Sequence, residues 1–245
     1  SFRHSLNGIW KFHYARNYES TVKGFEKEEY SCRDWDDIRV PAHIQMEGYD
    51  APQYANVQYP WEGHEDIHPG EIPEHFNPVA SYVKYFEVPE QMKGKRLFIS
   101  FQGAESGIAL WLNGKFVGYS EDSFTPSEFE LTDYVKGGEN KLAAQVFKWT
   151  ASSWCEDQDF YRFSGIYREV YLYTVPDVHV YDLQIRAIPD ETLKKAEFEI
   201  KTIAWGKGSV HIVLSKDGQT VLEDSKSLGA VAAESGSRNM DADAK

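Results

Sequence analysis

Short runs of alternating apolar and polar residues, separated by turn signals, recur along most of the chain. Before residue 176 these runs are LNGIWKFHYA, ASYVKYFEV, KRLFISFQG, SGIALWLNGKFVGYS, SEFELT, NKLAAQVFKW and GIYREVYLYTV. A side-chain period of two is typical of a strand with one buried face, and no segment of a dozen residues keeps a helical period. The pattern predicts an all-β sandwich.

One hairpin is especially clear. Asn113-Gly114 lies between alternating apolar positions in IALWLNGKFVGY, and this dipeptide suits the positive φ angles of a two-residue type I′ turn. Because side chains alternate across a strand, we expect one common face for Ile108, Leu110 and Leu112.

The composition excludes several classes of protein. With 39 acidic and 26 basic residues, the formal net charge is −13, so the chain repels the phosphates of nucleic acids. No apolar run reaches the roughly 20 residues that a membrane span requires. Cys32 and Cys155 form no C-x-x-C pattern, which predicts free thiols and neither a disulfide framework nor a zinc knuckle.

Aromatic residues make up 15% of the chain. Their rings fill the cores of sandwiches and can also stack on sugars. Trp111 and Trp149 each lie within an alternating run, so we predict that both are core residues and not sugar platforms.

Two features indicate the domain organisation. Residues 41–80 are rich in Pro, Gly and His and lack alternation. A loop this long is usually functional or disordered, and the Tyr and Trp content of this one favours an ordered, functional loop. A new series of strand-like runs starts after Val175-Pro176 and extends for about 70 residues, fewer than the roughly 100 of an immunoglobulin-like sandwich. We therefore expect two domains, 1–176 and 177–245, of which the second is incomplete.

The segment HEDIH, residues 64–68, matches the zinc-protease signature H-E-x-x-H. That signature works when a continuous helix places both histidines on one face. Gly63 precedes the segment and Pro69-Gly70 follows it at once, and a helix does not continue through such residues. We predict ordinary loop histidines and no zinc site.

The segment EDQD, residues 156–159, places three carboxylates beside aromatic rings. They lose hydration unless a cation, a hydroxyl-rich ligand, or an arginine such as Arg162 or Arg168 compensates them. Neighbouring carboxylates on one strand cannot flank a glycosidic bond from both sides, as the catalytic pair of a retaining glycosidase must. The residues alone leave open an ion-paired structural turn and a ligand site.

Several segments together resemble one family. They are SLNGIWKF, YDAPQYANVQYPW, SYVKYFEV, LWLNGKFVGYSEDSFTPSEFEL, GGENKLAAQVFKW and EDQDFYRFSGIYREVYL, and they occur in order from about residue 5 to residue 175. They are similar to the amino-terminal part of the large bacterial β-galactosidases of glycoside hydrolase family 2. The resemblance implies a galactose-binding-like jelly-roll β-sandwich over 1–176 and a truncated immunoglobulin-like β-sandwich over 177–245.

The resemblance also implies that substrate contacts and catalytic groups lie in different domains. In that family a TIM barrel, absent from this chain, holds the catalytic glutamates and the magnesium ligands, so this chain alone would be inactive. The whole enzyme would hydrolyse terminal β-D-galactosides with retention. Asn56, with Val57 beside it, matches a position that contacts the galactose, and Asp159 matches one that binds a sodium ion and galactose hydroxyls. Glu156 and Asp157 keep a structural role.

Other interpretations compete with this one. The pieces LNG-x-W and SGI-x-R also occur in β-glucuronidases and β-mannosidases, whereas YDAP-x-Y-x-NVQYP and EDQD favour a galactosidase. A free-standing carbohydrate-binding module would need a closed pocket lined by Trp61, Trp154 and Tyr161. A third interpretation is an interaction domain whose long loop serves assembly.

The resemblance implies further properties of the whole enzyme. Its partners would be a β-galactoside and the TIM barrel of its own chain, within a homo-oligomer. We expect a cytoplasmic enzyme, or a periplasmic or secreted one if a leader was removed before Ser1.

Overall fold

The computed structural model describes residues 3–156, 159–193, 196–228 and 241–244. The chain divides into two compact units, Ser1–Thr174 and Val175–Lys245. Helical structure in the described residues is limited to three short 3₁₀ helices, η1 (Ile44–Glu47), η2 (Glu90–Met92) and η3 (Ala151–Trp154). None of the described helices is long and apolar enough to cross a membrane. The predicted all-β class is confirmed.

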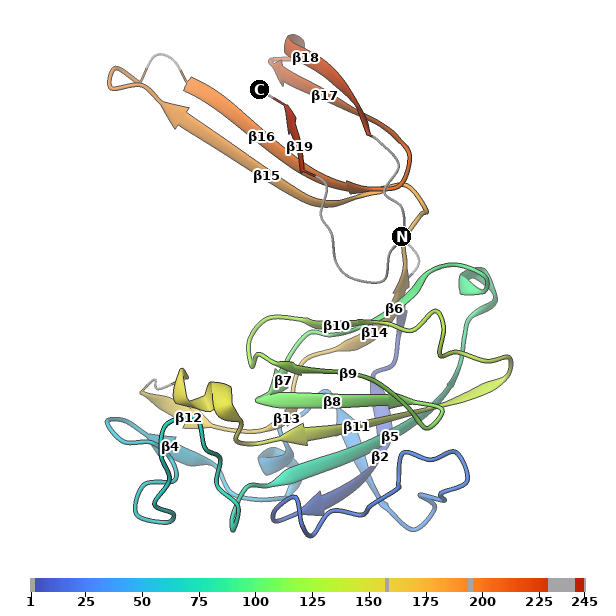
Figure 1. The fold of residues 1–245 in the computed structure, drawn as a ribbon, viewed down its shortest axis with the longest axis vertical. Helices are drawn as coiled ribbons and strands as arrows, with labels where there is room; N and C mark the ends of the chain where they lie inside the picture. Colours follow the sequence, from blue (N-terminus) through green and yellow to red (C-terminus); the bar gives the residue numbers. More distant parts are fainter. Residues whose placement is uncertain (1–2, 157–158, 194–195, 229–240, 245) are drawn as a thin grey trace. The chain divides into compact units, whose positions relative to one another are not determined.

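The first unit is built around two antiparallel sheets (Figure 1). The four-stranded sheet has the order β1 (Arg3–Ser5), β14 (Val170–Thr174), β6 (Leu97–Phe101) and β10 (Ser127–Glu130). The six-stranded sheet has the order β3 (Asp36–Val40), β2 (Gly8–Ala15), β5 (Val79–Glu87), β11 (Glu139–Phe147), β8 (Gly107–Leu112) and β9 (Lys115–Glu121). Each run predicted as a strand contains at least one observed strand, whereas the short β1 and β3 were not predicted.

Two short ladders accompany these sheets. The first pairs β4 (Gln53–Ala55) with β12 (Phe160–Arg162), and the second pairs β7 (Ala104–Glu105) with β13 (Gly165–Ile166). Both join segments that are far apart in the sequence.

The second unit contains the remaining strands. One sheet has the order β15 (His179–Pro189), β16 (Ala196–Trp205) and β19 (Asp241–Ala244), and β17 (Gly208–Lys216) pairs with β18 (Gln219–Leu228). Strands β15 to β18 coincide with the runs predicted after residue 176. Several apolar side chains of β15 are solvent-exposed, among them Tyr181 and Ile185.

The facing sides of the two main sheets form the core of the first unit. Phe12, Ile99 and Leu172 are completely buried there. Removing such a side chain from water contributes about 1.5–3 kcal/mol. The predicted common face is confirmed, since the core also contains Ile108, Leu110 and Leu112.

Part of the outer side of the six-stranded sheet is covered as well. A second apolar cluster joins the 22–35 segment to the sheet and contains Phe25, Cys32, Val83 and Ala143. Trp111 packs against this cluster, half-buried, with its ring centroid 6.1 Å from that of Phe25. The prediction for Trp111 is therefore corrected: the ring lies in the outer cluster, because its neighbours Leu110 and Leu112 take the inward face. Trp149 is buried, as predicted.

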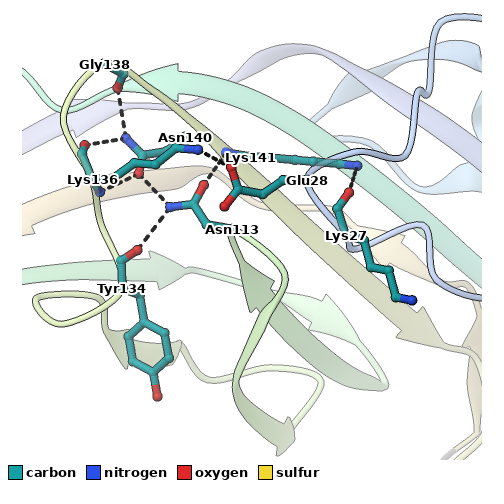
Figure 2. A network of polar contacts seen from close by, with 8 residues as sticks. All are labelled: Lys27, Glu28, Asn113, Tyr134, Lys136, Gly138, Asn140 and Lys141. Atoms are coloured by element: carbon teal, nitrogen blue, oxygen red, sulfur yellow. Dashed lines mark hydrogen bonds and ion pairs between the residues drawn. The ribbon is translucent and has the colours of Figure 1, made fainter.

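The turn between β8 and β9 has the predicted geometry. Asn113 and Gly114 have φ angles of 51° and 77°, which are the left-handed values that a type I′ turn needs. The Asn113 side-chain amide donates to the carbonyl of Tyr134 (3.0 Å) and to Oδ1 of Asn140 (2.8 Å), as Figure 2 shows. The hairpin is thus tied to the loop that precedes β11.

Asn140 is the centre of this network (Figure 2). Its side chain is completely buried, donates to the carbonyls of Lys136 (3.1 Å) and Gly138 (3.0 Å), and accepts from the Lys136 backbone N–H (2.9 Å). Next to it, Lys141 Nζ donates to the carbonyl of Lys27 (2.6 Å) in the covering segment. One network therefore connects the hairpin, the loop before β11 and the outer layer.

Glu105 is a buried carboxyl in β7. Its pKa is raised to about 8, mainly by burial and also by the negative charge of Glu156. A hydrogen bond from the Phe163 backbone N–H and the positive charges of Arg162 and Lys148 act in the opposite direction. An ordinary glutamate titrates near 4.5. Between pH 4.5 and about 8, Glu105 is protonated in the folded protein and ionised in the unfolded chain. The free energy of unfolding therefore falls as the pH rises through this range.

Asn140→Ala should lower the free energy of unfolding by about 2–4 kcal/mol, because it leaves several buried partners without a hydrogen bond. Urea unfolding measures the loss. Lys136→Ala is the matched control: it removes a half-exposed ion pair with Glu28 and should cost less than about 1 kcal/mol. Equal losses in the two variants would contradict the central role of Asn140.

Glu105→Gln should make the protein more stable than the parent above pH 8 and no more stable at pH 4.5. The difference should grow between these values by at most about 1.4 kcal/mol per pH unit, because the amide has no proton to release. Thermal unfolding across the pH range measures it. Glu139→Gln, at an exposed position, should show no such trend, and parallel curves for Glu105→Gln and parent would show that the carboxyl is ionised in the fold.

Candidate functional site

A two-stranded ribbon, formed by β4 and β12, carries the residues predicted to contact a ligand. Ala55 of β4 lies opposite Phe160 of β12 in an antiparallel ladder, and Figure 1 shows the two strands side by side. Asn56 directly follows Ala55, and Asp159 directly precedes Phe160. The fold therefore brings Asn56 and Asp159 to the same end of the ribbon.

Asp159 is held by a neighbour on the ribbon. The Tyr54 hydroxyl donates a hydrogen bond to Oδ1 of Asp159. This hydrogen bond is the main reason why the pKa of Tyr54 is raised, and a side-chain contact with Asn56 acts in the opposite direction. Tyr54 thus connects the two predicted site residues.

Tyr54 was not among the predicted site residues, although the sequence contained a signal for it. Residues two apart on a strand point to the same face, and Tyr54 stands two positions before Asn56. The contact with Asp159 had no such signal, because it depends on pairing between segments more than a hundred residues apart.

The ribbon presents a large exposed surface. Tyr54 and Tyr161 are 55% and 58% exposed, and their ring centroids lie 5.5 Å apart. Val57 is 90% exposed, and Asn56 and Asp159 are exposed as well. Exposed tyrosines beside an amide and a carboxylate suit either a sugar or a neighbouring protein surface.

The rest of the acidic segment has structural contacts. Glu156 Oε2 accepts a hydrogen bond from the Ser123 hydroxyl (3.1 Å), which agrees with its expected structural role, and Asp157 lies outside the described residues. The buried Arg162 donates to the carbonyl of Glu156. Arg168, the other arginine considered for the acidic charge, donates to the carbonyl of Phe124 (2.7 Å).

The HEDIH segment is a loop, as predicted. It contains no helix, and the Glu65 carboxylate accepts backbone N–H donors from Glu74 (2.8 Å), His75 and Phe76 (2.9 Å). Burial raises the pKa of Glu65, but these donors outweigh it and the net shift is downward. Among the described residues, no group of three or more His, Cys, Asp or Glu side chains could hold a metal ion. Glu65 therefore closes the loop on itself.

Cavities lie beside this loop, and two of them are lined by tryptophan side chains. The first, of about 520 Å³, is lined by residues that include Asp50, Gln53, Trp61, Lys148 and Trp149. The second, of about 630 Å³, is lined by residues that include Tyr59, Trp61 and Trp154. Tyr161 lines neither cavity, so these two do not gather the three rings that a free-standing binding module would need.

Comparison with known proteins identifies relatives for most of the chain. Residues 3–176 match the family described as "Glycosyl hydrolases family 2, sugar binding domain". A β-galactosidase of Halalkalibacterium halodurans is 58% identical over 199 residues, and one of Clostridium acetobutylicum is 49% identical over 222 residues. The alignments cover 81% and 89% of this chain, which spans only 20% and 25% of the length of those relatives.

Solved structures show the same fold at low sequence identity. A Bacteroides uniformis β-glucuronidase covers 100% of this chain with a TM-score of 0.70 at 20% identity, and this chain covers 27% of it. A glycosyl hydrolase family 2 member from Bacteroides cellulosilyticus covers 98% with a TM-score of 0.62 at 21% identity, and 30% of that protein is covered. The fold therefore agrees with the expected sugar-binding jelly roll.

The resemblance noted in the sequence is thus confirmed by relatives of high identity, by a matching fold and by a family match over most of the chain. The chain belongs to glycosyl hydrolase family 2, with its sugar binding domain at residues 3–176.

Proposed function

We propose that this chain is a non-catalytic, sugar-contacting part of a β-galactosidase, in which Asn56, Val57 and Asp159 contribute to a galactose site whose catalytic groups lie elsewhere. The observation that carries the proposal is the pairing of β4 with β12, which brings Asn56 and Asp159 to one exposed end of the ribbon. Similarity to β-galactosidases at 49% and 58% identity supports galactosides as the substrate class.

Asn56 and Asp159 have the chemistry that sugar hydroxyls need. A carboxylate accepts hydrogen bonds from hydroxyls, and an amide both donates and accepts them. Bonds to a charged acceptor are the stronger ones. The Tyr54 hydroxyl occupies Oδ1 of Asp159 and thereby orients the carboxylate, which keeps Oδ2 for a ligand.

These contacts would assist catalysis by positioning the substrate. Retaining glycosidases cleave the bond with two carboxyl groups about 5–5.5 Å apart, but the residue that the ribbon brings to the same end as Asp159 is the neutral Asn56. Contacts with the non-reacting part of the sugar can instead hold the scissile bond in place. They raise kcat if they are stronger in the transition state than in the bound substrate. Bond cleavage is therefore assigned to residues outside this chain.

Asp159 would also supply one ligand of a sodium ion. Carboxylate oxygens suit hard cations, and the exposed Asp159 has one oxygen beyond the Tyr54 contact. The described residues contain no complete cluster of acidic, His or Cys ligands, so the remaining oxygens of this site would come from other groups. Magnesium is proposed only for the part of the enzyme that holds the catalytic groups.

A β-glucuronidase or β-mannosidase is the main rival within the family. The solved β-glucuronidase is only 20% identical to this chain, a level at which the similarity concerns the fold and not the substrate. The β-galactosidase relatives reach 58%. The galactoside assignment is therefore preferred.

The chain of 245 residues alone should not hydrolyse a chromogenic β-galactoside above the rate of a buffer blank, because a carboxyl pair that flanks the bond is needed. The measurement is release of the chromophore, with a complete family 2 β-galactosidase as positive control. Turnover that a single Asp or Glu substitution abolishes would refute the non-catalytic assignment.

Asp159→Asn in the complete enzyme should lower kcat/KM for a galactoside about ten- to hundredfold, since one hydrogen bond to a charged group is worth about 1.5–3 kcal/mol. A sodium titration of the kinetics should show a weaker response than in the parent. Asp34→Asn, at an exposed position of the 22–35 segment, is the control and should change neither quantity. Parental kinetics in Asp159→Asn would place the sugar contact on another residue.

A further inference from the structure

We propose that a buried polar network at the base of the ribbon positions Asn56 and Asp159 for sugar binding. The network consists of Gln45, Asp50, Lys148 and Ser164. The inference rests on the proposed function of the ribbon and adds positioning residues that do not themselves need to touch the sugar.

The network reaches both strands at the end of the ladder opposite the sugar contacts. Asp50 stands three residues before Gln53, where β4 begins, and Ser164 stands two residues after Arg162, where β12 ends. Gln53 and Arg162 face each other as the last pair of the ladder. With about 3.3 Å per residue, the ladder is about 10 Å long. A change in the orientation of the strands at its base therefore displaces Asn56 and Asp159 at the other end.

Gln45 connects the two bases of the ribbon. Its Nε2 donates to Oδ2 of Asp50 (2.9 Å) and to the hydroxyl of Ser164 (2.9 Å), while its Oε1 accepts from the Ser164 backbone N–H (3.0 Å). Gln45 itself lies in η1 and is buried. One side-chain amide therefore fixes the spacing between the segment that enters β4 and the segment that leaves β12.

The hydrogen-bonded group of Gln45, Asp50 and Ser164, here called the Gln45 bracket, is anchored to the main sandwich by Lys148. Its Nζ lies 2.5 Å from Oδ2 of Asp50, and the two side chains are 1% and 6% exposed. Lys148 directly follows β11, an interior strand of the six-stranded sheet, and its backbone N–H donates to the carbonyl of Pro78 (3.0 Å). An ion pair of two buried side chains thus connects the segment before β4 to the residue that follows β11.

The surroundings give this polar contact a specific role. Asp50, Gln53 and Lys148 all line the 520 Å³ cavity, so the base of β4 borders a hollow on that side and not a close-packed apolar core. A buried ion pair is often no more stabilising than apolar residues of the same volume, but its short, directed bonds define one geometry. A binding site needs its groups held to within about 0.5 Å.

The test is a double-mutant cycle in the complete enzyme that contains this chain. Lys148→Met should lower kcat/KM for a chromogenic β-galactoside about tenfold in the parent, because misplaced sugar contacts no longer align with the reacting groups. In the Asp159→Asn background, Lys148→Met should lower kcat/KM about threefold or less, since the sugar contact that Lys148→Met displaces is already weakened. Lys148→Arg should retain most of the parental activity.

A matched control separates positioning from general loss of stability. Asn140→Ala removes a buried polar group from the network before β11, far along the strand from Lys148. It should lower the melting temperature, yet its effect on kcat/KM should be the same in both backgrounds. If Lys148→Met does not fold, Ser164→Ala replaces it in the cycle, because it deletes a single hydroxyl from the bracket.

Hydrogen exchange tests the network independently of activity. Amides of residues 53–56 and 159–163 should exchange faster in Lys148→Met than in the parent, and Asn140→Ala should leave them unchanged. Unchanged exchange in the ribbon, or equal kinetic losses in the two backgrounds, would overturn the positioning role. If Asp159→Asn alone had parental kinetics, the proposed sugar contact would fail, and the exchange result would still decide whether the network holds the ribbon.

Discussion

Burial of the two facing sheet surfaces is the interaction on which the first unit depends. Apolar side chains such as Phe12, Leu110 and Ile99 exclude water completely between the sheets, and this contact orders strands that contribute little stability singly. Once β11 is fixed, both of its ends become reference points for polar groups. Asn140 at its start organises the hairpin, and Lys148 just past its end reaches the base of the ribbon.

The six-stranded sheet is covered on its inner face and on part of its outer face. The 22–35 segment covers the outer side of the sheet around Val83, Trp111 and Ala143. Strands buried on both sides lose the simple alternation of a half-exposed strand. This explains why β11 is buried at nearly every position. It also explains why Lys141 is buried there: its ammonium donates to the carbonyls of Lys27 (2.6 Å) and Tyr30 (2.7 Å) in the covering segment.

Patterns within a few neighbouring residues predicted the long strands and one turn of the fold. Alternation located the long strands, and Asn113-Gly114 located a turn, because both effects act within a few residues. Trp111 was assigned to the wrong apolar layer, since alternation separates two faces but does not say that both are covered. The β4–β12 pairing had no local signal, because three-residue strands are too short for a period and their partners meet only through the tertiary fold. Asn56 and Asp159 were therefore found by resemblance, while the Gln45 bracket appeared only in the structure.

The ladder between β4 and β12 also makes the two halves of the ribbon interdependent in sequence. A one-residue insertion or deletion within either strand reverses the side to which its following side chains point, so it displaces Asn56 or Asp159 relative to the other. The loop over residues 61–76 lies outside this ladder, and Glu65 closes it through backbone N–H groups of residues 74–76. We therefore expect an insertion or deletion in this loop to leave the spacing of Asn56 and Asp159 unchanged, because the loop lies outside the ladder.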